Sequence, residues 1–161
     1  MSFITLIKTI ITGTGGAPTE YTLGVDISHW QGRINFQSMK DRGIKFVIMK
    51  ATDVGDATKM PFIDDTFVDN YYGAKSVGLL TGAYCWLDPR YDPTLQARFY
   101  LDEIFYKYPQ DAPPVMDFED TNVISWNDML WRGQKWLDVV EKEVGRIPII
   151  YTAKWYMDYF D

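Results

Sequence analysis

Cysteine and histidine are nearly absent from this sequence of 161 residues, which has one of each, Cys85 and His29. A single cysteine excludes an internal disulfide and a thiolate metal cluster, and its place in an apolar run predicts a buried structural thiol. A single histidine excludes a zinc site with several histidine ligands and any Ser–His site that needs a second histidine. We therefore expect neither a metal ion nor a cofactor.

Clusters of basic residues and long apolar runs are also absent. The chain has 16 Lys and Arg against 22 Asp and Glu, a formal net charge of −6, so it lacks the electrostatic footprint of a nucleic-acid-binding protein. No stretch is long and apolar enough to span a membrane. Residues 3–11 are apolar, but Lys8 interrupts them and no positive residue precedes them, which makes a poor secretory signal. This stretch fits either a strand or an arm that docks on a partner.

What remains is the composition of a folded domain. Hydrophobic residues make up 47% of the chain and aromatic residues 16%, which excludes a disordered protein and predicts one domain with a substantial core. The glycine-rich residues 13–19 (GTGGAPT) predict a flexible linker. We therefore divide the chain into an N-terminal arm with its linker, residues 1–19, and one domain, residues 20–161.

Strands and helices alternate along this domain. Short apolar runs predict buried strands, and apolar residues at helical spacing followed by glycine predict helices. The predicted strands are residues 23–28, 44–51, 79–86, 115–118 and 147–152, and the predicted helices are residues 34–42, 64–77, 93–108 and 127–144. This alternation indicates βαβ units and an α/β fold with a parallel sheet.

Two acids close the fourth predicted strand, within residues 113–120 (PPVMDFED). Because side chains alternate along a strand, Asp117 and Glu119 point the same way, with Cα atoms roughly 6.5 Å apart. Carboxyls this close repel each other when both are ionised, so one is expected to keep its proton to a higher pH. The pair suits an acid and an anionic stabiliser around one bond, and solvated acids at a strand end are the alternative interpretation.

Polar and aromatic residues also follow the other predicted strands. In parallel α/β folds, chemistry lies at the C-terminal ends of the strands. Those ends and the segments after them carry Asp26, Trp30, Lys50, Asp64, Tyr84, Trp86 and Tyr151. Carboxylates beside aromatic rings suit a sugar, whose C–H faces pack on rings and whose hydroxyl groups need acceptors.

Each of these residues has a structural alternative. Asp26 can cap the turn after its strand, Asp64 can cap a helix, and Lys50 can pair with an acid of the site. The aromatic side chains can belong to the core or the surface.

Several stretches together resemble the family 25 glycoside hydrolases, the Chalaropsis-type lysozymes or N-acetylmuramidases. The matching stretches are residues 24–32 (GVDISHWQG), 46–52 (FVIMKAT), 64–67 (DDTF) with Asn70 and Ala74, 82–84 (GAY), Gln96 and Ala97 with Phe99, 114–119 (PVMDFE) and 148–152 (PIIYT). Their order and spacing agree with the family from residue 21 to about residue 155. Any one stretch is weak, whereas the set is specific.

The resemblance implies an α/β fold similar to a TIM barrel, (β/α)5(β)3, in which five βα units precede three further strands. It implies cleavage of the β-1,4 bond from N-acetylmuramic acid to N-acetylglucosamine in peptidoglycan. Glu119 matches the family's acid, Asp117 the carboxylate that orients or stabilises the substrate's 2-acetamido group, and Asp26 the first-strand aspartate. The residues expected to bind substrate are Tyr84, Trp86, Tyr151, Trp30, Lys50 and Asp64.

The chain departs from the family pattern after the fifth predicted strand, because the sequence stops at Asp161. We expect the last three strands, and an aspartate that the family carries on one of them, to be absent. Either the sequence is a fragment, or a partner supplies the missing wall, or the fold is completed in another way. An open sheet would otherwise expose apolar edges.

The leading hypothesis is a peptidoglycan muramidase that acts at the cell wall, as a phage lysin, a virion-associated wall-degrading part or a secreted enzyme. Its partner is the glycan strand, with a protein partner or virion assembly contacted through residues 1–19. The alternative is a non-catalytic glycan-binding or structural module on the same scaffold, and a third hypothesis is a hydrolase of another glycan such as chitin. The complete Asp-x-Glu pair favours catalysis, and the incomplete barrel favours the module.

Overall fold

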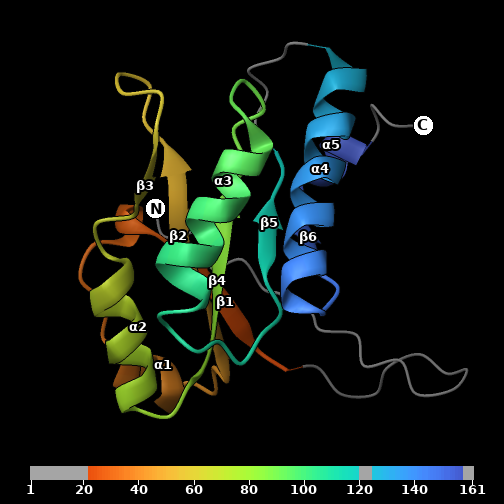
Figure 1. Ribbon diagram of the computed structural model, residues 1–161. Coiled ribbons are helices and arrows are strands. Elements are labelled where there is room, and N and C mark those ends of the chain that lie inside the picture. Colours follow the sequence, from red (N-terminus) through yellow and green to blue (C-terminus); the bar gives the residue numbers. More distant parts are fainter. Residues whose placement is uncertain (1–21, 120–124, 158–161) are drawn as a thin grey trace, which may run out of the picture.

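A curled sheet with helices on its outer side forms the part of the chain that the computed structural model describes, residues 22–119 and 125–157 (Figure 1). Its parallel strands are β1 (Gly24–Ile27), β2 (Phe46–Val54), β4 (Leu80–Trp86), β5 (Val115–Asp117) and β6 (Ile149–Tyr151), side by side in that order. The five predicted strands and their parallel arrangement are confirmed. A short strand that the sequence pattern does not predict, β3 (Pro61–Ile63), pairs antiparallel with β2. Three residues are too few to show a period.

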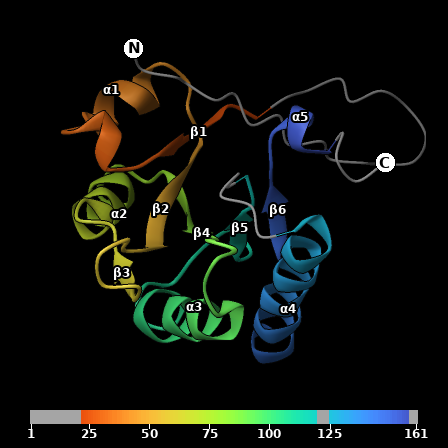
Figure 2. The same cartoon turned by 90° about the horizontal axis from the view of Figure 1, so that it is seen from above.

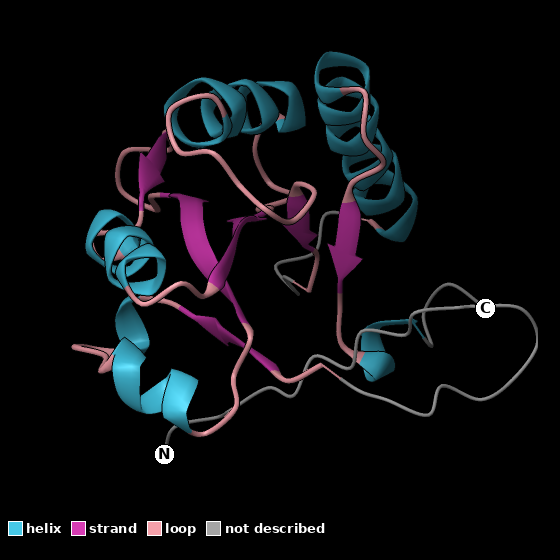
Figure 3. Ribbon diagram, turned by 90° about the horizontal axis from the view of Figure 1, so that it is seen from below, coloured by secondary structure: helices cyan, strands magenta, loops and turns pink. Residues whose placement is uncertain are grey.

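The helices lie where the sequence predicts them, with shifted ends. They are α1 (Phe36–Asp41), α2 (Phe67–Ser76), α3 (Pro93–Tyr100) and α4 (Trp126–Val144), and they surround the convex side of the sheet (Figures 2 and 3). The helix predicted over residues 93–108 changes its winding, because α3 continues into a π-helical segment, η2 (Leu101–Phe105). Two short segments, η1 (His29–Gln31) and α5 (Lys154–Met157), follow β1 and β6.

Local sequence explains where the longest helix begins and ends. Ser125 caps α4 through a hydrogen bond from the backbone N–H of Asp128 to its hydroxyl oxygen, 3.2 Å long. At the other end Gly145 adopts φ 68°, the left-handed conformation that glycine reaches without strain. Between these caps one side of α4, including Trp136, is buried against the sheet.

Alternation of side chains divides the strands between two faces. The outer face packs against the helices in one large buried cluster, whose strand residues include Val25, Ile27, Val47, Met49, Ala83, Cys85 and Met116. The inner, concave face carries a smaller cluster of Ile48, Tyr84 and Val115. Full burial of one large apolar side chain stabilises a fold by about 1.5–3 kcal/mol, so the outer cluster holds the sheet in place. Cys85 is among these buried residues, which confirms the predicted structural thiol.

The sheet is curled but not closed. Among the described strands, β1 and β6 each pair on one side only. The inner face is therefore open between β1 and β6, and three residues that face it, Leu80 on β4 and Ile149 and Ile150 on β6, are each 44–54% exposed. The α/β class and the parallel sheet are as predicted, and the described residues form a half-barrel and not a complete (β/α)5(β)3 barrel.

Close packing around Gly82 on the inner face predicts that a larger residue at this position lowers stability. A Cβ at this position would lie 2.4 Å from the Ile48 Cδ1 atom and 2.9 Å from the Ala112 Cβ atom. Gly82→Ala should therefore lower the free energy of unfolding by about 1–3 kcal/mol, as overpacking does. Urea unfolding measures this, with Leu80→Ala on the same strand as a control that should change stability by about 0.5 kcal/mol. Equal stability of Gly82→Ala and the parent would contradict this packing.

Candidate active site

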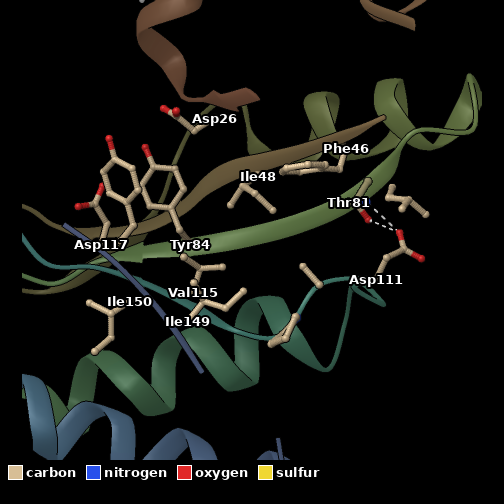
Figure 4. Close-up of a pocket in the computed structure, with 14 residues that line it drawn as sticks. Asp26, Phe46, Ile48, Thr81, Tyr84, Asp111, Val115, Asp117, Ile149 and Ile150 are labelled. Carbon is tan, nitrogen blue, oxygen red and sulfur yellow. Dashed lines mark hydrogen bonds between the residues drawn. The ribbon is translucent and has the colours of Figure 1, made fainter. Parts of the chain in front are cut away.

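A cavity of about 410 Å³ runs along the inner face of the sheet. Figure 4 shows Asp26, Tyr84 and Asp117 at one end of it, with Thr81 and Asp111 at the other. Tyr151 lines the cavity too, and the remaining lining is apolar: Phe46, Ile48, Leu80, Ala112, Pro113, Val115, Ile149 and Ile150. The structure thus brings two of the predicted acids and two of the predicted aromatic residues to one cavity.

The pairing of β5 with β6 sets the direction of the Asp117 and Glu119 side chains. Phe118 donates its backbone N–H to the Tyr151 carbonyl oxygen at 2.8 Å, and the Thr152 hydroxyl donates to the Phe118 carbonyl oxygen at 2.6 Å. The Phe118 side chain packs in the outer cluster. Because Phe118 points outward, Asp117 before it points to the inner face, where it lines the cavity. If the alternation continues past the end of β5, Glu119 lies on the same side.

Burial and nearby carboxyl charges raise the pKa of both acids. Asp117 is 5% exposed, and burial and the charge of Glu119 raise its pKa to about 8, although the charge of Lys50 acts to lower it. Burial and the charge of Asp26 raise the pKa of Glu119. Within the described residues, the buried Oδ1 atom of Asp117 accepts no hydrogen bond. No hydrogen bond at this atom therefore stabilises the ionised carboxylate. The pair therefore keeps a proton at neutral pH.

Such a pair can do acid chemistry on a bound ligand. A carboxyl group that keeps its proton at neutral pH can act as a general acid, and the neighbouring carboxylate can orient a donor or stabilise positive charge. Tyr84 faces the same cavity, and burial followed by the charges of Asp117 and Asp26 raises its pKa, so its hydroxyl group stays a donor. Tyr151 is the register partner of Asp117 on β6.

Lys50 is bound to an acid that the sequence analysis does not select, Asp53. The Lys50 Nζ atom lies 2.5 Å from the Asp53 Oδ2 atom and 5.1 Å from the centroid of the Trp86 ring. The motif KATD shows Asp53 three residues after Lys50, but regular strand alternation would place the two on opposite faces. Contact of Lys50 and Trp86 with substrate stays a prediction.

Asp64 and Trp30 lie outside the lining of the cavity. Asp64 is buried, and its carboxylate accepts hydrogen bonds from the Thr66 backbone N–H at 3.0 Å and the Thr66 hydroxyl at 2.7 Å. Its Oδ2 atom lies 2.6 Å from His29 Nδ1. Burial acts to raise the pKa of Asp64, but the bonds with His29 and Thr66 outweigh it and hold the pKa below its usual value. Asp64 thus ties η1 to the start of α2.

Trp30 sits on η1 with its side chain 81% exposed and its ring centroid 4.6 Å from that of His29. Such an exposed ring suits a sugar face, but Trp30 is not among the residues that line the cavity. For Trp30, as for Asp64, contact with substrate stays a prediction.

Two further findings concern residues 22–119 and 125–157 alone. No group of three or more His, Cys, Asp or Glu side chains is placed there to hold a metal ion. None of the helices in these ranges has the length and apolar character needed to cross a membrane.

Burial raises the pKa of the Cys85 thiol to about 12, so this thiol stays neutral.

Comparisons with known proteins agree with the geometry. Residues 25–160 match the sequence model described as "Glycosyl hydrolases family 25". The uncharacterized protein YegX of Escherichia coli (strain K12) is 36% identical over 142 residues, which cover 84% of this chain and 50% of YegX. Lysozyme M1 of Streptomyces globisporus is 36% identical over 98 residues, 55% of this chain and 32% of that protein. The chain thus spans about half of YegX and about a third of lysozyme M1.

A solved structure gives the same result. The crystal structure of the bacterial lysozyme from Streptomyces coelicolor is similar with a TM-score of 0.72 and 27% identity, over 88% of this chain and 67% of that one.

The raised pKa of Asp117 predicts how stability depends on pH. The folded pKa, about 8, lies above the ordinary value of 3.8, so the folded state binds this proton more tightly than the unfolded state. The resulting stabilisation is fully present below about pH 4 and is lost as the pH rises through about 8. Asp117→Asn cannot ionise and should remove this loss, as measured by urea unfolding across that range.

Asp111 provides a control of opposite sign. Burial acts to raise its pKa, but the ion pair with Lys75 and hydrogen bonds from Thr81 outweigh burial and lower it. Asp111→Asn should therefore cost stability at neutral pH and less at low pH. A pH dependence in Asp117→Asn identical to that of the parent would contradict the assignment for Asp117.

Proposed function

The chain belongs to the family 25 glycosyl hydrolases, and we propose that it hydrolyses the β-1,4 bond between N-acetylmuramic acid and N-acetylglucosamine in bacterial peptidoglycan. The observation that carries the proposal is the acid pair at the end of β5, which keeps a proton at neutral pH beside a cavity lined by Asp26, Tyr84 and Tyr151. Similarity to lysozyme M1 supports peptidoglycan as the substrate.

Glu119 is the proton donor in this proposal. It is only partly buried, whereas Asp117 is 5% exposed, so Glu119 is the acid that a glycosidic oxygen above the cavity reaches. Proton transfer from Glu119 lets the bond between the anomeric carbon and the leaving oxygen break. The leaving sugar then departs with a neutral hydroxyl group.

Asp117 assists from the other side of the same bond. It accepts the N–H of the substrate's 2-acetamido group, whose oxygen bonds to the anomeric carbon as the leaving oxygen departs. An N–H donated to Asp117 favours its ionised form, so substrate binding moves the proton of the pair to Glu119. Glu119 then takes a proton from the water that attacks the anomeric carbon, which restores the acetamido group.

The open side of the cavity needs a wall. Leu80, Ile149 and Ile150 line the cavity and are half exposed, and an apolar surface of this kind favours coverage by further polypeptide. We propose that the three strands that complete the family's barrel, with their aspartate, provide that wall. Residues 1–19 lie outside the described residues, so their role as an attachment arm stays a prediction.

Peptidoglycan lies outside the cytoplasmic membrane, so the proposed substrate also sets where the protein acts. The proposal is action at the cell wall, as a secreted enzyme, a phage lysin or a virion-associated part. The family membership supports the wall as the place of action without choosing among these three.

Replacement of the proposed acid tests the function. Glu119→Gln should reduce the clearing of purified bacterial cell walls by about 10²–10⁴-fold, because the amide cannot donate a proton to the leaving oxygen. The matched control is Glu103→Gln on η2, which removes an exposed carboxylate paired with Lys107 and should clear walls like the parent. Clearing by Glu119→Gln at the parent's rate would show that Glu119 is not the acid.

The products identify the bond. Borohydride reduction of the digest should convert N-acetylmuramic acid ends to muramitol. Reduced glucosamine ends would instead indicate cleavage of the other glycosidic bond, and bound walls with no new reducing ends would indicate a non-catalytic module. Chitin oligomers assayed in parallel should stay intact.

A further inference from the structure

A β-bulge in β2 lies beside the acid pair. In the pairing of β2 with β4, Lys50 lies opposite Tyr84, but Thr52 lies opposite Cys85, so Ala51 is an extra residue. Ala51 belongs to the outer cluster, and Thr52, also buried, lies beside the Cys85 thiol of that cluster. Two successive side chains therefore point outward, and the alternation after them is reversed.

The reversal brings Asp53 to the face that carries Lys50. Without the bulge, residues 50 and 53 would point to opposite sides of β2. In the structure their side chains meet, with Lys50 Nζ 2.5 Å from Asp53 Oδ2. Both are largely buried, since the Lys50 side chain is 9% exposed and that of Asp53 is 20% exposed. The bulge thus serves to build this ion pair on the inner face.

The pair has a defined place in the site. An ammonium group buried this far is costly unless it is paired, and Asp53 supplies that partner. The face of the Trp86 ring, 5.1 Å from Lys50 Nζ, adds a second favourable contact. Trp86 is the register partner of Asp117 on the neighbouring strand, so the pair lies beside the strand end that carries the proposed catalytic acids.

We propose that Asp53 is a positioning residue of the active site: the bulge turns it to the inner face, where it pairs with the Lys50 ammonium group beside Trp86 and partly neutralises the positive charge that acts on Asp117. The inference rests on the proposed function, because it gives the pair a part in the reaction assigned to Asp117 and Glu119. Removing either member of the ion pair should shift the Asp117 titration, in a direction that depends on the charge removed.

Several charged or titratable groups share this region. Asp117 is affected by Glu119 after β5, by Asp26 on β1, and by Lys50 and Asp53 on β2, while Tyr84 on β4 and Tyr151 on β6 line the same cavity. Lys50 acts to lower the pKa of Asp117, whereas Asp26, Asp53 and Glu119 act to raise it. Among these groups Lys50 carries the positive charge, so its partial neutralisation by Asp53 matters for the whole set.

The test is a double-mutant cycle read by NMR titration of the Asp117 carboxyl carbon. Asp53→Asn keeps the shape but leaves Lys50 unneutralised, so the Asp117 titration should move about one pH unit lower. Lys50→Met removes the positive charge, so the titration should move about one pH unit higher. The double variant removes a neutral pair and should titrate close to the parent. Shifts of the same sign in both single variants, or none in Asp53→Asn, would overturn the proposal.

Two further measurements make the outcome decisive. If Lys50→Met fails to fold, the comparison of Asp53→Asn with the double variant still isolates the effect of Lys50. The exposed pair of Glu103 on η2 with Lys107 just after it supplies the controls Lys107→Met and Glu103→Gln, which should leave the Asp117 titration unchanged. Asp53→Glu, which retains the charge, should titrate nearer to the parent than Asp53→Asn does.

The pH profile of wall clearing links the pair to the reaction. The pH values at which clearing rises and falls should shift in the same direction as the Asp117 titration. They should move to lower pH in Asp53→Asn and to higher pH in Lys50→Met. If no variant and no parent clears walls, the proposed function fails, while the titrations still decide the role of Asp53. If the parent clears walls but Asp53→Asn has the parent's titration and pH profile, the role of Asp53 alone is wrong.

Discussion

Repulsion among carboxyl groups held close together on one face of the sheet is the constraint on which the site depends. Asp117 is the last residue of β5, Glu119 follows two residues later, and Asp26 lies on β1. Water would weaken this repulsion, but burial excludes water from the carboxyl groups. The cluster therefore keeps a proton that a solvated carboxyl group would lose. The rest of the fold has to hold these groups together against that cost.

The outer cluster provides the force that does so. The strands that present acids inward turn their alternate residues outward into the large apolar cluster against the helices. Phe118, between Asp117 and Glu119, belongs to that cluster, so the core and the acid pair are fixed by the same three residues. Stability and chemistry therefore share one strand without competing for its side chains.

Much of the fold and part of the site follow from the sequence. Apolar runs and helical spacing predict all five parallel strands and the four longer helices, because these patterns are local and long enough to show a period. Asp26, Asp117, Tyr84 and Tyr151 were expected together because parallel strands end at one edge, and the structure places them around one cavity. Asp64 and Trp30 lie outside that lining, because their positions depend on the path of the segments after β1 and β3.

The sequence by itself determined the alternation of strands and helices, the side of β5 on which its acids lie, and the family to which the chain belongs. Only the tertiary structure decided the ion pair of Lys50 with Asp53 and how far the pKa of Asp117 rises. The reason is physical: periodicity is a property of neighbouring residues along the chain. A bulge is visible only in the register between two strands, and a pKa depends on burial and on charges brought from distant strands.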